Sequence, residues 1–190
     1  MISIHGHTIE ESIVTDGVII DIGCRGFEFS NYFNGKKVYC IDPDEDVFKT
    51  PPKDLICMNL AISDKEGDAH YKRNGEYTSV GEIYQPLSHM YFPCKTITMK
   101  QLYDITGENV DLLKLDCEGA EYIILGDGFI PIPKQITVEF HNHTVPDVHI
   151  KNIDKVMNNL LAHYNLVYQH ETGMDNLFIK TEETLKLFIK

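Results

Sequence analysis

The sequence predicts a single-domain α/β protein over residues 1–190, built on a doubly wound and mostly parallel β-sheet. Short, unbroken apolar runs alternate with segments of helical spacing along most of the chain, and two strand-like runs follow each other near its end. Unbroken apolar strands suit a sheet that is covered on both faces, as parallel sheets are. With 43% hydrophobic and 24% charged residues, the chain has an ordinary globular composition and enough length for one core.

Five apolar runs predict the buried strands of this sheet. They are GVIIDIG at 17–23, KVYCID at 37–42, LICMNLAI at 55–62, VDLLKLD at 110–116 and QITVEFH at 135–141. The first is rich in β-branched residues, and the others have the same unbroken apolar character. Between the last two lies EGAEYIILGDG, whose apolar spacing is helical until its glycines end the helix.

The C-terminal part departs from simple alternation of strands and helices. Residues 147–164 carry apolar side chains at intervals of three and four, which predicts an amphipathic helix. NLVYQHE and DNLFIK then lie on either side of Gly173 and predict an antiparallel hairpin. Earlier in the chain, the irregular stretch at about 64–98 predicts short strands or a mobile flap, followed by a helix over roughly 99–105.

Composition restricts the partners and the location. A net charge of −12 disfavours nucleic acid and anionic membrane surfaces, because both are bound through Lys and Arg. We therefore expect a small-molecule partner and leave the oligomeric state open. The five cysteines form no C-x-x-C pair and no run approaches the length of a membrane span, so we expect reduced thiols in a cytoplasmic protein.

Polar side chains stand at the ends of four of the predicted strands. Asp21 ends the first, Asp42 the second, Asp116 the fourth, and Glu139 with His141 the fifth. Doubly wound sheets bind their ligands outside the carboxyl ends of the strands. Burying an unpaired carboxylate is costly, so we expect these side chains to line a binding crevice and not a core.

The turn after the first strand, DIGCRGFEFS, indicates which cofactor binds. Gly23 and Gly26 let the backbone approach a bound molecule, but the leading glycine of the dinucleotide fingerprint G-x-G-x-x-G is missing. Asp21 would repel a pyrophosphate and suits a ligand that carries an ammonium group. Asp42, about twenty residues further on, is placed to accept both ribose hydroxyls. These features favour S-adenosylmethionine over NAD.

One block of the sequence is similar to the signature of a known family. VDLLKLDCEGAEYIIL resembles the signature of the FkbM-type S-adenosylmethionine-dependent methyltransferases, and other blocks of that family are matched in register by IIDIGCRG, CIDPDED, NLAISDKEG and ITVEFHN. The resemblance extends from about residue 17 to DNLFIK. It implies the Rossmann-like class I methyltransferase fold, with seven strands in the order 3-2-1-4-5-7-6 and the seventh antiparallel. The implied reaction is O-methylation of a hydroxyl, on a sugar or another small molecule.

The resemblance also implies roles for individual residues. The cofactor would be held at several strand exits: Asp21, Gly23 and Gly26 at the methionine moiety, Asp42 at the ribose, Ala61 and Ile62 at the adenine, and Ser63 or Asp64 near its exocyclic amine. The acceptor would be faced by Asp116, Glu118, Glu139 and His141.

The residue types suggest how the acceptor hydroxyl loses its proton. His141 is the favoured general base, because an unperturbed imidazole has a pKa of about 6.5, and Glu118 is the second choice. Metal assistance is the less favoured alternative. In it, Asp116, Glu139 and Asn142 would offer oxygen ligands to a divalent ion such as magnesium.

Two other functions stay open at this point. A strand, a glycine turn and a distal Asp also occur in NAD-dependent oxidoreductases, although the glycine triad is missing here. The other alternative is a catalytically silent S-adenosylmethionine-binding module, because Gly26 lies one residue closer to Gly23 than is usual in the family and Arg25 adds a charge. His5 and His7 form an H-x-H pair, which we interpret as part of an ordinary flexible N-terminus.

Overall fold

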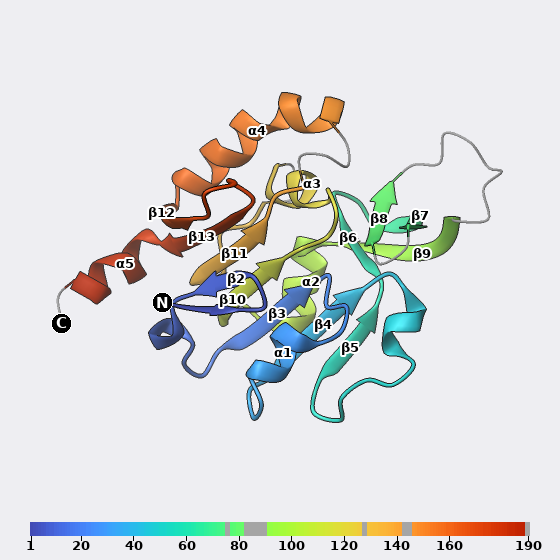
Figure 1. Ribbon diagram of the computed structural model, residues 1–190, viewed down its shortest axis with the longest axis horizontal. Coiled ribbons are helices and arrows are strands. Elements are labelled where there is room, and N and C mark those ends of the chain that lie inside the picture. Colours follow the sequence, from blue (N-terminus) through green and yellow to red (C-terminus); the bar gives the residue numbers. More distant parts are fainter. Residues whose placement is uncertain (75–76, 82–90, 127–128, 142–145, 189–190) are drawn as a thin grey trace.

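The central sheet contains seven strands in the order β12-β13-β11-β10-β3-β4-β5 (Figure 1). The structure is a computed structural model that describes residues 1–74, 77–81, 91–126, 129–141 and 146–188. From β5 to β11 all neighbours are parallel, and β13 is antiparallel to both of its neighbours. The strands are β3 (Val18–Ile22), β4 (Val38–Asp42), β5 (Ile56–Asn59), β10 (Val110–Leu115), β11 (Gln135–Glu139), β12 (Tyr164–Gln169) and β13 (Asp175–Lys180).

The α/β class and the mostly parallel sheet are as predicted. Each of the five apolar runs contains a strand, the predicted C-terminal hairpin forms β12 and β13, and the strand order is the one that the resemblance implied. One run differs, because 55–62 does not form a single strand. The Leu60 amide donates to the Met58 carbonyl at 3.1 Å, and beyond this turn β6 (Ala61–Ser63) joins a different sheet.

One face of the central sheet is covered by three helices. These are α2 (Met99–Thr106), α3 (Glu121–Gly126) and α4 (Pro146–Leu161). Their apolar side chains share one core with side chains from β3, β4, β10 and β11. This face has the helical covering that a doubly wound sheet requires.

The other face is covered by a short helix and a hairpin. The helix is α1 (Glu28–Tyr32), and the hairpin consists of β1 (Ile2–Ile4) and β2 (His7–Ile9). Both isoleucines that end these two strands, Ile4 and Ile9, pack in one core cluster with Ile19 of β3. The hairpin thus shares the covering of this face with the helix.

The N-terminal hairpin also corrects the expectation of a flexible N-terminus. Ile4 pairs with His7 across the hairpin, and the two residues between them, His5 and Gly6, have φ angles of 50° and 90°. Two positive φ angles in succession are typical of the two-residue turns that match the twist of a hairpin. The turn therefore fixes the side chain of His7 on the inner side, where it is 3% exposed.

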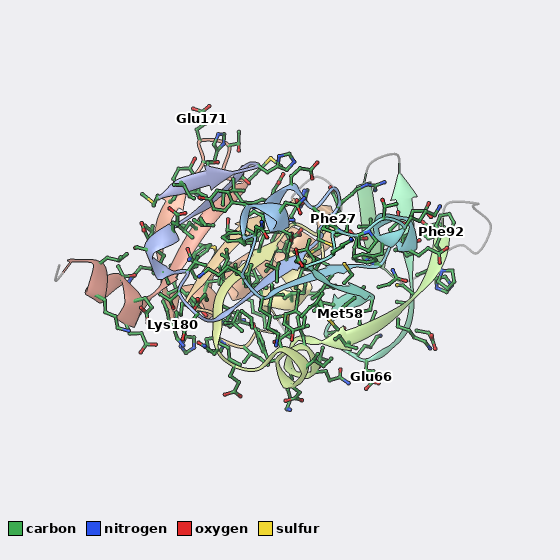
Figure 2. All side chains as sticks on the ribbon, turned by 90° about the horizontal axis from the view of Figure 1, so that it is seen from below. Phe27, Met58, Glu66, Phe92, Glu171 and Lys180 are labelled. Atoms are coloured by element: carbon green, nitrogen blue, oxygen red, sulfur yellow. The ribbon has the colours of Figure 1, made fainter. Side chains whose placement is uncertain are left out.

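A second, smaller sheet has the strand order β6-β9-β7-β8. Its longer strands are β7 (Gly67–Asn74), β8 (Tyr77–Gly81) and β9 (Tyr91–Thr98), so the described part of the stretch at about 64–98 forms strands. The rings of Tyr71 and Phe92 stack within this sheet, with centroids 5.3 Å apart. Figure 2 shows Phe92 near one end of the long axis of the molecule and Lys180, at the end of β13, near the other.

The helices begin and end close to the predicted positions. α2 starts at Met99 because the side chain of Thr98 caps it, accepting the Gln101 amide at 3.3 Å. α3 begins at Glu121, later than its apolar spacing predicted, because Glu118 and Gly119 have positive φ angles. Two further helical segments were not predicted, η1 (Glu11–Ile13) and α5 (Thr181–Phe188), and the connection from β4 to β5 contains η2 (Glu45–Phe48). In the part of the chain that the structure describes, no helix has the length and apolar character needed to cross a membrane.

Candidate functional site

A cavity of about 540 Å³ opens at the carboxyl ends of β3, β4, β10 and β11. Its volume lies within the range of small-molecule sites. Ten of the residues expected at the site line it, namely Asp21, Gly23, Gly26, Asp42, Ala61, Ile62, Asp116, Glu118, Glu139 and His141. Asp64 is exposed and is not among the lining residues, and Asn142 lies outside the described residues.

The exits of β3 and β10 touch each other beneath the cavity. Gly23 has a φ angle of 81°, and a Cβ atom at this position would lie 1.7 Å from the carbonyl oxygen of Asp116. No other residue fits such an approach without moving the backbone. The glycine turn therefore brings two of the strand exits together, whatever the cavity binds.

A buried lysine was missed by the sequence analysis and lies under the same exits. Lys114 is paired in register with Asp21 across β10 and β3, and its Nζ lies 3.1 Å from Asp21 Oδ1 and 3.3 Å from Asp116 Oδ2. Burial would lower the pKa of Lys114, but the charges of Asp21 and Asp116 outweigh it, so the pKa is raised. The only sequence signal was a charged residue inside the apolar run LLKLD.

The lysine changes the role expected of Asp21. The carboxylate of Asp21 is completely buried, pairs with Lys114 and accepts the Ser30 hydroxyl at 2.6 Å. Its negative charge is thus balanced inside the protein. Asp21 nevertheless lines the cavity, and its contact with the ammonium group of a ligand stays a prediction.

Asp42 is a second buried carboxylate with a different environment. Its Oδ1 accepts the amide of Asp44 at 2.8 Å. Burial is the main cause that raises the pKa of Asp42 from 3.8 to about 6, and the Asp44 hydrogen bond opposes it. Asp42 is therefore ionised at neutral pH but takes up a proton in mild acid.

Three carboxylates and an imidazole meet at the opposite end of the cavity. Nε2 of His141 lies 3.5 Å from Glu118 Oε1, 3.5 Å from Glu139 Oε1 and 3.7 Å from Asp116 Oδ1. Burial would raise the pKa of Asp116, but Lys114 and a neighbouring histidine hold it well below its usual range. Burial raises the pKa of both Glu118 and Glu139.

Glu121 organises this cluster from below. It is completely buried and its Oε1 lies 3.0 Å from His141 Nδ1. The same side chain accepts the amides of Cys117 at 2.7 Å and Gly119 at 2.9 Å, which fixes the loop between β10 and α3. Glu121 is thus a positioning residue for both the loop and the imidazole.

The environment of His141 differs from the one assumed in the sequence analysis. Burial lowers the pKa of an imidazole, but the hydrogen bond to Glu121 and the charges of Glu121, Glu118 and Asp116 outweigh it and raise the pKa of His141 to about 9. The imidazole is therefore protonated at neutral pH. A base that titrates near neutrality was the reason for choosing His141, and that reason does not hold for the cavity as it stands.

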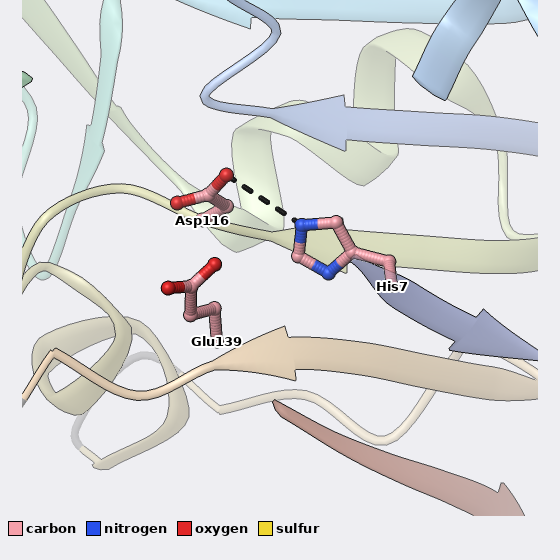
Figure 3. Close-up of side chains that lie close together, drawn as sticks. All are labelled: His7, Asp116 and Glu139. Carbon is pink, nitrogen blue, oxygen red and sulfur yellow. Dashed lines mark ion pairs between the residues drawn. The ribbon is translucent and has the colours of Figure 1, made fainter. Parts of the chain in front are cut away.

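His7 is the second residue that the sequence analysis missed. It reaches the cavity from β2, and its Nε2 lies 3.5 Å from Asp116 Oδ2, with Glu139 on the neighbouring strand end (Figure 3). Its ring meets the edge of Phe29 with centroids 5.6 Å apart. Among the described residues, two groups have the composition and spacing of metal ligands: His7 with Asp116 and Glu139, and Asp116 with Glu118 and His141.

A family model described as the methyltransferase FkbM domain matches residues 21–167, which is more than half of the chain. The chain belongs to the FkbM methyltransferase family. The FkbM match begins at the end of β3, ends in β12 and contains every residue expected at the site; His7 precedes it. The membership predicted from the LKLDCEGAE block is thus confirmed. No curated protein matches the sequence significantly.

A solved structure supports the fold. The crystal structure of the methyltransferase FkbM from Methylobacillus flagellatus KT superposes with a TM-score of 0.51 and covers 87% of this chain, at 13% sequence identity. At that identity the similarity concerns the fold alone. This chain covers 43% of the M. flagellatus protein, so it spans less than half of that length.

Proposed function

We propose that this FkbM chain transfers a methyl group from S-adenosylmethionine to a hydroxyl of a sugar or another small molecule. The observation that carries the proposal is that Asp42, Asp116 and Glu139 share one cavity with the apolar side chains of Ala61 and Ile62. Ala61 and Ile62 follow β5, beside the β4 exit that carries Asp42, whereas Asp116 and Glu139 stand at the ends of β10 and β11. S-adenosylmethionine has a flat adenine and ribose hydroxyls at one end and positive charge at the other, which suits this order.

The residues of the chain fit the proposed cofactor in three places. Ala61 and Ile62, both buried, would lie against the adenine, and the ionised carboxylate of Asp42 would accept the ribose hydroxyls. The loop from Gly23 to Gly26 would follow the methionine moiety. When bound, S-adenosylmethionine supplies a methyl group on a positively charged sulfur, and the anionic end of the cavity suits that charge.

Glu118 is the residue that we assign to remove the acceptor proton. Burial raises its pKa, which makes its carboxylate a stronger base than an exposed one. His141 is protonated at neutral pH, so it cannot take up the proton, but it faces Glu118 at 3.5 Å and orients the carboxylate. The order of preference from the sequence analysis is thus reversed.

The test is a transfer assay with mass spectrometry. We expect purified protein, incubated with S-adenosylmethionine and a panel of sugars and small alcohols, to add one methyl group to a hydroxyl of at least one acceptor and to release S-adenosylhomocysteine. Binding of the cofactor without transfer to any acceptor would instead favour a catalytically silent module. Absence of both binding and transfer would end the proposal.

A further inference from the structure

We propose that His7, Asp116 and Glu139 bind a divalent ion that takes mixed nitrogen and oxygen ligands, such as Zn²⁺ or Mn²⁺. The three side chains come from three segments that lie far apart in the sequence: β2, the exit of β10 and the end of β11 (Figure 3). Their ligand atoms all lie within 4.8 Å of one another. This site differs from the all-oxygen magnesium site considered from the sequence, since it includes an imidazole and does not need Asn142.

The state of the His7 ring indicates a missing partner. The side chain is 97% buried, yet its Nε2 is 3.5 Å from Asp116 Oδ2, longer than a well-formed hydrogen bond. Its Nδ1 is buried and has no hydrogen-bond partner among the described residues. Nε2 is thus the atom that faces Asp116, and its long contact leaves it available as an ion ligand. The unpaired Nδ1 points away from Nε2 in the ring plane and is not assigned to the ion.

The spacing of the ligands suits a small ion. Bonds of about 2.0–2.2 Å to a tetrahedral ion separate neighbouring ligand atoms by roughly 3.3–3.6 Å. The 3.5 Å between His7 Nε2 and Asp116 Oδ2 falls in that interval. Three protein ligands leave further coordination positions for other oxygens, and all three side chains line the cavity.

The charges nearby also balance a divalent ion. Lys114 contacts Asp116 from inside at 3.3 Å, and Asp21 neutralises that lysine. Asp116 and Glu139 then contribute two negative charges. Lys114 also orients the Asp116 carboxylate, as the partners of ligating carboxylates commonly do.

The ion site deepens the proposed function and rests on it. An ion held by these three residues would polarise an oxygen of the acceptor and lower the pKa of its hydroxyl, so that Glu118 could remove the proton more easily. The imidazole ligand favours ions that accept nitrogen, such as Zn²⁺ or Mn²⁺, over magnesium. The inferred acceptor is a neutral hydroxyl compound that offers an oxygen to this ion.

The test is calorimetric titration of chelator-treated protein with ZnCl₂ and with MnCl₂. We expect one ion per chain in the wild type and, for His7→Gln and Glu139→Gln, affinity weaker by about tenfold or more. His163→Gln and Glu171→Gln are matched controls. Both residues are exposed and neither is among the residues that line the cavity, so neither substitution should change ion affinity.

Three results would overturn the ion site. The first is no ion binding to the wild type, and the second is undiminished binding to both His7→Gln and Glu139→Gln. The third is loss of binding in His141→Gln while His7→Gln binds the ion as tightly as the wild type. Circular dichroism monitors folding, and if His7→Gln is unfolded, Glu139→Gln decides the question. Titration with S-adenosylmethionine is run separately. Ion binding without cofactor binding would keep this site and refute the proposed function. Cofactor binding without ion binding would keep the proposed function and refute this site.

Discussion

The two groups of residues proposed to face the cofactor and the acceptor differ in their charge. The first group, here called the donor end, has one buried carboxylate among apolar side chains and consists of Asp42, Ala61 and Ile62. The second, the acceptor end, has three carboxylates and two imidazoles and consists of His7, Asp116, Glu118, Glu139 and His141. At the donor end, the charge of Asp42 is stabilised locally by the backbone amide of Asp44. At the acceptor end, each charge depends on its neighbours and on Lys114 below them. We therefore expect substitutions at the donor end to have local effects, and substitutions at the acceptor end to have effects that spread.

The most severe loss is expected where the acceptor end meets the core. Lys114→Met leaves Asp21 buried without its cationic partner, and breaking a buried ion pair in this way costs about 3–5 kcal/mol of unfolding free energy. Urea unfolding followed by circular dichroism measures it. The double variant Lys114→Met with Asp21→Asn should recover part of the loss.

Lys100→Met is the matched control, because Lys100 pairs with Asp104 on the exposed surface of α2. Exposed pairs contribute little, so the control should unfold like the wild type. Equal stability of Lys114→Met and Lys100→Met would show that the acceptor end is not supported from the core.

The next largest effect is expected on catalysis. Glu118→Gln removes the assigned base and should lower the turnover number by roughly a hundredfold to a thousandfold, while the affinity for S-adenosylmethionine stays nearly unchanged. Single-turnover kinetics and equilibrium binding separate the two quantities. His141→Ala should slow transfer less, since it orients Glu118. A larger loss in His141→Ala than in Glu118→Gln would return the role of base to the histidine.

At the donor end, Asp42→Ala should weaken cofactor binding by roughly tenfold to a hundredfold, the usual effect of removing hydrogen bonds to a charged group. The fold should stay intact, because the carboxylate of Asp42 is held by the amide of Asp44 within its own strand exit. Asp64→Ala is the comparison: Asp64 is exposed and is not among the residues that line the cavity, so binding should change by less than about twofold. Equal losses in the two variants would contradict the assignment of the ribose site.

The smallest expected effect is a dependence of the unfolding free energy on pH, which arises from Asp42. Its pKa rises from 3.8 to about 6 on folding, so the folded protein holds this proton more tightly than the unfolded chain does. Its contribution to stability is complete below about pH 4 and is lost as the pH rises through about 6. Asp42→Asn should therefore gain more stability over the wild type at pH 8 than at pH 4.

Cofactor binding should also depend on the ionisation of Asp42, but it should weaken at low pH, where the protonated side chain stabilises the fold. The ribose hydroxyls need the ionised carboxylate as acceptor, so affinity for S-adenosylmethionine should fall as the pH drops below about 6. In Asp42→Asn this pH dependence should disappear. Titrations at several pH values check it, and an unchanged dependence in Asp42→Asn would assign the titration to the acceptor end.

The strand exits could be predicted from the sequence because an apolar run that ends in an acid is a local pattern. Asp21, Asp42 and Asp116 were found in this way, and the structure brings them to one cavity. Lys114 was missed because its meaning depends on register: only the pairing of β10 with β3 places it opposite Asp21. A single charged residue inside an apolar run is the signal to examine in such cases.

His7 was missed for a different reason. The His5-Gly6 turn between two short runs containing isoleucine was a local hairpin signal, but the sequence did not show that the hairpin packs over the cavity. The raised pKa of His141 could not be predicted either, because it depends on contact with Glu121 and Glu118 from another segment. Residue types were thus predictable, whereas their charge states depended on tertiary contacts.

The most direct measurement is calorimetric titration of the wild-type protein with S-adenosylmethionine, beside a titration with NADH. If the carboxylates around the cavity hold a cationic methyl donor, one molecule of S-adenosylmethionine binds per chain and NADH gives no heat of binding. A protein that binds NADH, or that binds neither compound, would contradict the account.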